Sequence, residues 1–198
     1  MITGFAARAG LVLAVLGATS HAMATDVSYD FFELRFVDAE LDDSNADGDG
    51  FLIGGSYNVS GNWLIIGSYQ TLEFDGDVDL NTLEFGGGYV WPIDPQYDLF
   101  ATGSIVRAEV DAGTFDDDET GFRIVGGARA KFTSQFEGRA ELNYIDVDDS
   151  DTFIRLGGDF YFTPEFAGGV TLDVGGDVDA ITFGIRYFFG ERRVRDVR

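Results

Sequence analysis

The 198-residue chain contains no cysteine, and its only histidine, His21, lies close to the N-terminus. Without cysteine, the fold has no disulfide bonds and no thiol chemistry. Histidine is also absent beyond residue 24, so the usual base that activates a serine or a water near neutral pH is missing. We therefore expect a protein that is not an enzyme. A catalytic pair of carboxylates is conceivable, but nothing singles one out.

Long hydrophobic runs are scarce as well. The run at 11–18 (LVLAVLGA) follows Arg8 and precedes the small-x-small site Ala22-Met23-Ala24. This pattern predicts a secretory signal peptide at 1–24, which is removed on export and whose apolar core is too short for a membrane helix. No later segment approaches the roughly 20 apolar residues that a membrane helix needs. A membrane protein built from this chain must therefore cross with β-strands.

Positive charge is the third shortage, because residues 25–198 hold 12 Lys and Arg against 35 Asp and Glu. Such a chain repels phosphates, which excludes nucleic acid as a partner. Cations or a basic protein surface are compatible with it. Aromatic residues make up 15% of the chain and glycine occurs 27 times, a balance typical of aromatic belts and tightly curved strands. The length suits a single domain.

Acidic residues are concentrated in five connections that alternate with four short, nearly acid-free ones. The acidic connections lie at 38–50, 73–79, 109–119, 146–151 and 173–179, and we expect them to be long loops. The short ones lie at 58–62, 92–96, 133–135 and 163–165 and contain the three prolines, where a missing backbone donor breaks no strand ladder.

Ten strands are expected between these connections, at 28–37, 50–57, 62–73, 78–91, 97–109, 120–132, 136–146, 151–162, 166–174 and 179–189. Most have the roughly 9–11 residues with which a tilted strand crosses the hydrocarbon. The fold class predicted is all-β, a transmembrane antiparallel up-and-down β-barrel of ten strands. Eight strands are the alternative if one weak pair is loop.

Alternation of apolar and polar residues indicates which face of each strand points outward. In 120–132, Phe122 and Ile124 share one face and Arg123 and Arg129 the other. The charged residues expected inside the barrel are Glu33, Arg35, Glu84, Arg123, Arg129, Lys131, Glu137, Arg139, Glu141, Arg155, Asp159 and Arg186, whereas Arg107 is ambiguous. A cation facing lipid at the midplane costs about 2–4 kcal/mol, so cations belong inside. In a narrow barrel they form a paired plug or line a narrow channel.

Aromatic residues cluster beside the short connections, at Tyr57, Trp63, Trp91, Tyr97, Phe132, Phe136, Phe162, Phe166, Tyr187 and Phe189. Rings of this kind prefer the membrane interface, so the row indicates a girdle at one end of the barrel. A soluble β-sandwich also alternates, but it does not need an aromatic row at a single end. The pattern predicts acidic connections at the cell surface and tight turns in the periplasm.

The last strand carries a recognisable pattern in Thr182, Gly184, Tyr187 and Phe189. It resembles the terminal-strand signal of bacterial outer-membrane proteins, which implies recognition by the barrel-assembly machinery. Residues 25–189 resemble small outer-membrane barrels of the OmpA and OmpX kind, and are most similar to the acidic barrels called diffusible-signal-factor-regulated outer-membrane proteins. The resemblance implies the bacterial outer membrane as location and its lipids and lipopolysaccharide as partners, and we expect a monomer. Residues 190–198 (GERRVRDVR) depart from the pattern as a basic tail, expected in the periplasm.

One acidic connection partly matches a calcium loop. Asp43, Asn45, Asp47 and Asp49 have the D-x-[DN]-x-[DN]-G spacing, but position twelve is Gly54 instead of glutamate, so this is not an EF-hand. Hard oxygen ligands at this density hold Ca²⁺ or Mg²⁺ weakly, on the order of 10⁻⁴–10⁻³ M. We expect no other cofactor.

The function predicted from the sequence is therefore that of a non-enzymatic outer-membrane barrel with acidic surface loops and a structural or surface-interaction role. The alternatives are a narrow channel for small polar or cationic solutes, and adhesion or recognition through the loops.

Overall fold

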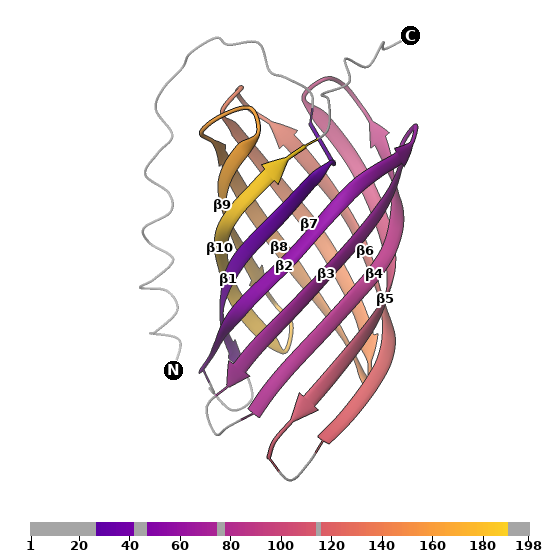
Figure 1. The fold of residues 1–198 in the computed structure, drawn as a ribbon. Helices are drawn as coiled ribbons and strands as arrows, with labels where there is room; N and C mark the ends of the chain where they lie inside the picture. The colour runs from indigo at the N-terminus through magenta and orange to yellow at the C-terminus, as the bar shows by residue number, and fades with distance from the viewer. Residues whose placement is uncertain (1–26, 42–46, 75–77, 114–115, 190–198) are drawn as a thin grey trace.

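Ten antiparallel strands close into a barrel in the computed structural model, which describes residues 27–41, 47–74, 78–113 and 116–189 (Figure 1). The strands are β1 (Phe31–Leu41), β2 (Asp47–Ser60), β3 (Trp63–Phe74), β4 (Val78–Pro92), β5 (Tyr97–Asp111), β6 (Asp116–Lys131), β7 (Phe136–Val147), β8 (Asp149–Tyr161), β9 (Phe166–Val174) and β10 (Val178–Phe188). The ten-stranded prediction is confirmed, and the eight-stranded alternative is wrong.

Each strand pairs with its neighbours in sequence, and β1 pairs with β10 to close the barrel. This last seam runs from Phe31 opposite Phe188 to Leu41 opposite Val178. The four tight turns lie at the top of Figure 1, at the end where β1 begins and β10 finishes. We call this the tight-turn end and the opposite one the acidic end. Closure leaves no strand edge unpaired, which a barrel in lipid requires.

No helix in the described part of the chain is long and apolar enough to cross a membrane.

The acidic connections are much shorter than predicted, because most of their residues belong to strands. β1 continues to Leu41 and β2 already begins at Asp47, so only 42–46 are left of the loop expected at 38–50. Between β7 and β8 a single residue remains, Asp148, with a positive φ of 64°. The ladder is held by backbone hydrogen bonds, which acidic side chains do not interrupt. The two ends of the barrel therefore differ in charge and not in loop length.

The faces of the strands agree with the predicted alternation. Phe122 and Ile124 of β6 are exposed on the outside, whereas Arg129 and Lys131 of the same strand are buried inside. All twelve charged residues predicted for the interior lie on inward-facing positions. The ambiguous Arg107 faces outward and is 52% exposed, beside Glu109 and Asp118 at the acidic end.

Three apolar clusters lie inside the barrel, and the third, formed by Tyr161, Ala167 and Phe188, is at the tight-turn end. The first, at the acidic end, consists of Val37, Ala39, Leu72, Phe74 and Ala180. The second, also at the tight-turn end, consists of Val27, Tyr29, Leu64 and Val90. The lumen charges lie partly between the two ends and partly beside the tight-turn clusters, where Arg129 packs on Tyr29 and Lys131 on Tyr161.

Gly184 shows how the seam between β1 and β10 depends on one small residue. A Cβ atom at this position would collide with the backbone oxygen of Leu34 and with Cα of Arg35. The missing side chain lets Arg35 lie flat across β10 and reach its partners in the lumen. A side chain at Gly184 would force the two strands apart.

Candidate functional site in the barrel lumen

A group of four ionised side chains from β1, β8 and β10 forms the centre of the lumen, and we call it the lumen network: Glu33, Arg35, Asp159 and Arg186. Arg186 donates to Glu33 Oε2 from Nη2 (2.9 Å) and to Asp159 Oδ2 from Nη1 (3.0 Å). Arg35 donates from Nε to the same Glu33 oxygen (2.7 Å). The two arginines and Asp159 are at most 4% exposed, so each charge depends on the others for compensation.

Three further close ion pairs lie elsewhere in the lumen, and one of them joins Arg129 of β6 to Glu137 of β7. Arg155 binds Asp173 through two parallel hydrogen bonds, from Nε (2.7 Å) and from Nη2 (2.6 Å). Arg123 donates from Nη1 to Glu84 (2.8 Å). Asp173 belongs to both the expected strand 166–174 and the acidic connection 173–179, and the structure places it on the inward face of β9. The alternation of the strand indicates this position, because Asp173 lies two residues after the inward-facing Thr171.

Arg139 of β7 is the exception among the lumen arginines of the described chain. Its guanidinium donates no hydrogen bond to a described residue, and its nearest carboxylate oxygen, Oε1 of Glu141, lies 3.9 Å from Nε. The side chain is only 12% exposed. The buried Nε has lost water without gaining a hydrogen-bond acceptor, which is unfavourable.

The segment Val27–Asp30, which precedes β1 and which we call the inner plug, lies inside the lumen at the tight-turn end. It was predicted as part of the first strand from residue 28, but β1 begins at Phe31. The Tyr29 ring is buried against Phe100 (centroid distance 6.2 Å) and under the Arg129 guanidinium (4.5 Å). Arg129 also donates to the Ser28 carbonyl (2.9 Å). These contacts hold the segment across the lumen.

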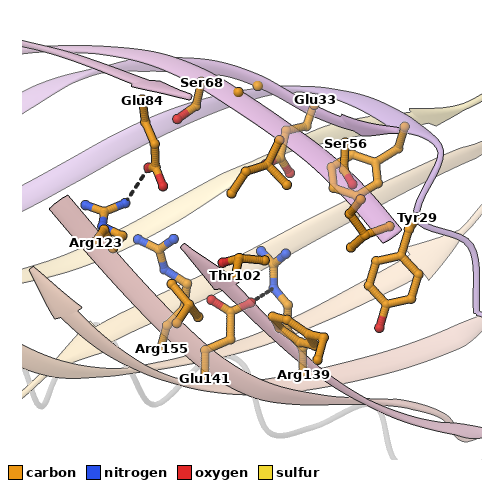
Figure 2. Close-up of a pocket in the computed structure, with 18 of the residues that line it drawn as sticks. Tyr29, Glu33, Ser56, Ser68, Glu84, Thr102, Arg123, Arg139, Glu141 and Arg155 are labelled. Carbon is orange, nitrogen blue, oxygen red and sulfur yellow. Dashed lines mark hydrogen bonds and ion pairs between the residues drawn. The ribbon is translucent and has the colours of Figure 1, made fainter. Parts of the chain in front are cut away.

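The space that remains inside the barrel consists of two cavities. The inner cavity, about 160 Å³, lies next to the plug and is lined by Tyr29, Leu64 and Phe100 among others. The outer cavity, about 600 Å³, reaches the acidic end. Four side chains border both: Glu33, Arg123, Arg139 and Arg155. Figure 2 shows the three guanidinium groups turned toward the same central space, with Tyr29 at one side of the group and Glu84 at the other.

The residues predicted to bind calcium do not form one loop. Asp43 and Asn45 lie outside the described residues, whereas Asp47 and Asp49 lie on the outward face of β2. Asp49 instead belongs to a row of outward-facing carboxylates that are direct cross-strand neighbours and that we call the carboxylate row: Asp38, Asp49, Glu73, Asp79 and Asp111. No group of three or more metal-ligating side chains in the described part of the chain is arranged to hold a metal ion.

The terminal-strand residues divide between the two faces of β10. Thr182 and Gly184 lie on the lumen face, and Tyr187 lies on the outer face. Phe189 stacks outside the barrel on Phe32 (4.8 Å between centroids) and donates its backbone N–H to Asp30. The predicted signal peptide at 1–24 and the basic tail at 190–198 lie outside the described residues.

Comparison with solved structures finds other barrels. The chain is similar to the KdgM porin at 14% identity and a TM-score of 0.44, covering 80% of this chain and 99% of that one. It is similar to neisserial surface protein A at 17% sequence identity and a TM-score of 0.44, covering 82% of this chain and 98% of that one. It is also similar to Ail, the attachment invasion locus protein of Yersinia pestis, at 16% sequence identity and a TM-score of 0.41. That match covers 81% of this chain and 99% of Ail. No curated protein matches the chain.

The family comparison covers nearly the whole chain. Residues 3–189 match the family described as outer membrane protein beta-barrel domain. The structure agrees with this match, since it is a closed barrel with an apolar outer face and a charged, buried interior. The chain therefore belongs to the outer membrane protein β-barrel domain family.

Proposed function

We propose that this protein is a non-enzymatic, integral outer-membrane barrel with a closed lumen, which strengthens the membrane and presents its acidic end at the cell surface. The family supports the bacterial outer membrane as its location. The proposed orientation is the one expected from the sequence, with the acidic connections outward, because the connections at the two ends are similar in length. The observation that carries the proposal is the inner plug, because a lumen blocked at one end passes no solute.

The paired charges of the lumen support a closed barrel over the alternative, a narrow channel. Every lumen arginine of the described chain has a carboxylate oxygen within 4 Å. Charges that neutralise one another hold their side chains across the interior and leave no unpaired row to guide a permeating ion.

We expect refolded wild-type protein in planar lipid bilayers to show no steady conductance steps. The double variant Val27→Ala/Tyr29→Ala should show small steps, because the buried Tyr29 ring and the Val27 side chain fill the tight-turn end. Single-channel recording with the same protein preparations measures both.

The matched control for this experiment is Tyr57→Ala, which removes an exposed ring from the outer face at the same end of the barrel and should be silent. Steady steps from the wild-type protein would overturn the closed-lumen proposal in favour of the channel. A silent double variant would show that the paired charges close the lumen without the plug.

We also propose that the acidic end attracts divalent cations weakly to its outer surface, as counterions of the carboxylate row and without a coordination site among the described residues. Like charges directly opposite each other destabilise a sheet, by roughly 0.2–1 kcal/mol a pair. The row contains four such contacts in succession, from Asp38 to Asp111. Calcium or magnesium would relieve this repulsion and bridge the carboxylates to lipopolysaccharide phosphates.

Calcium at millimolar concentration is expected to raise the unfolding temperature of the refolded barrel more than sodium at equal ionic strength does. The double variant Asp49→Asn/Asp79→Asn should lose most of this difference, because both residues are inner members of the row. Glu165→Gln at the tight-turn end is the control, and this variant should keep the difference between the calcium and sodium shifts. Identical shifts with calcium and sodium would show that only general screening is at work.

A further inference from the structure

The outer cavity has an apolar wall, although it opens toward the acidic end of the barrel. Five of the side chains that form it are Val37, Leu52, Leu72, Leu80 and Val106, from β1 to β5. Polar side chains are the rule on the inside of an outer-membrane barrel that holds only water. The volume, about 600 Å³, lies in the range of small-molecule sites.

The floor of this cavity carries more arginines than carboxylates, and the carboxylates beside them are Glu33 and Asp173. Arg35, Arg123, Arg139 and Arg155 border it from β1, β6, β7 and β8. Arg155 makes two hydrogen bonds to Asp173, whereas Arg35 Nη1 and Arg123 Nε have no acceptor among the described residues. Arg139 donates no hydrogen bond to any of them. The floor therefore has unused donors for one acceptor group with two oxygens, the geometry that a guanidinium binds best.

The mouth of the cavity carries the opposite charge, from Asp117, Glu119, Asp148 and Asp151. These carboxylates repel small inorganic anions that approach from the acidic end. An anion with an aliphatic body has a compensating gain, because it buries its body against the apolar wall. The cavity thus combines repulsion at the mouth, apolar contact along the wall and attraction at the floor.

We propose that the outer cavity binds an amphipathic carboxylate, with the carboxylate on Arg139 and the aliphatic body along the wall formed by β1–β5 and β10. The bound carboxylate supplies the acceptor that Arg139 lacks, and the aliphatic body displaces water from apolar side chains. An uncharged alcohol buries its aliphatic body against the wall, but it brings no charged acceptor to the arginines of the floor. An alkylammonium ion in the same orientation satisfies the wall and places its charge near four arginines. This site goes beyond the proposed structural role and shares only the closed lumen with it.

The test is calorimetric titration of the full barrel in phosphatidylcholine nanodiscs, with empty nanodiscs as the baseline and octanoate, octanol and octylammonium as probes. Octanoate should bind the wild-type protein at least about tenfold more tightly than octanol, the contribution of one charged, bidentate hydrogen-bonded contact. Arg139→Gln should abolish this preference. Its matched control is Arg107→Gln, which makes the same change on the outer face and should keep the preference.

A second variant keeps the test independent of the arginine. Ala108 lines the cavity on β5, so Ala108→Phe should fill the cavity and weaken octanoate binding at least about tenfold. Ala140→Phe adds the same ring on the exposed face of β7 and should have no effect. Equal binding of octanoate and octanol, tighter binding of octylammonium, binding no greater than to empty nanodiscs, or an unaltered Arg139→Gln variant would each overturn the proposal. Conductance of the wild-type barrel tests the closed lumen separately.

Discussion

Replacing Arg186 with methionine is expected to destabilise the barrel by about 3–5 kcal/mol, the range measured when one partner of a buried ion pair is removed. Arg186 is 1% exposed and is hydrogen-bonded to both Glu33 and Asp159. Without it these two buried carboxylates share the single cation Arg35. Methionine fills a similar volume, so the loss reports on charge compensation more than on packing. Urea unfolding of the barrel refolded into lipid vesicles measures the change.

The matched control is Arg107→Met, which also removes an arginine that bridges two carboxylates. Arg107 is 52% exposed on the outer surface, and exposed pairs contribute about 0–1 kcal/mol. Equal losses from the two variants would contradict the assignment of Arg186 to a desolvated network. The comparison depends on position alone, because both substitutions make the same chemical change.

Replacing Leu156 with arginine is expected to cost about 2–4 kcal/mol in the free energy of unfolding from a bilayer, as for a cation on the lipid face at the midplane. Leu156 is exposed on the outer face of β8, between the apolar positions Ile154 and Phe160. Its cross-strand neighbours Ala140 and Leu172 are apolar as well, so the introduced charge has no partner within the band. The same unfolding measurement in lipid vesicles gives the value.

Thr152→Arg is the control for this prediction, since Thr152 lies on the same strand and face but next to the acidic end. Arginine costs about 0–1 kcal/mol near the membrane interface. A Leu156→Arg variant that is as stable as Thr152→Arg would show that this part of β8 does not face hydrocarbon, and would argue against the membrane position of the barrel.

The number of strands and the face on which each residue lies could be predicted from the sequence. Successive side chains of an extended backbone point to opposite faces, which is a local property. The faces of Phe122, Arg123 and Ile124 can therefore be predicted without knowing which strands lie beside them. The ends of the strands were predicted less well. Asp38 and Asp49 looked like loop residues because they are acidic, but they are paired across β1 and β2. The low strand propensity of aspartate reflects its side chain, whereas the backbone hydrogen bonds between strands form with any residue except proline. Strands can therefore continue through acidic residues.

The candidate site was predicted in its composition and not in its arrangement. The sequence indicated that Arg139 and Arg186 face the lumen. It contained no sign that Arg186 is hydrogen-bonded to two carboxylates whereas Arg139 donates to no described carboxylate. It also did not indicate that the segment Val27–Asp30 turns into the lumen, because a short polar and aromatic segment before a strand is compatible with many positions.

The sequence by itself determined a ten-stranded barrel with cations inside, aromatic rings at one end and acids at the other, because these features follow from the two-residue period of a strand and from which residues lipid tolerates. The tertiary structure alone decided which charges neutralise each other and where the segment Val27–Asp30 lies. Glu33 and Arg186 are 153 residues apart and become direct neighbours only when β1 pairs with β10. Charge compensation in this lumen is therefore a consequence of register and closure, which are properties of the whole barrel.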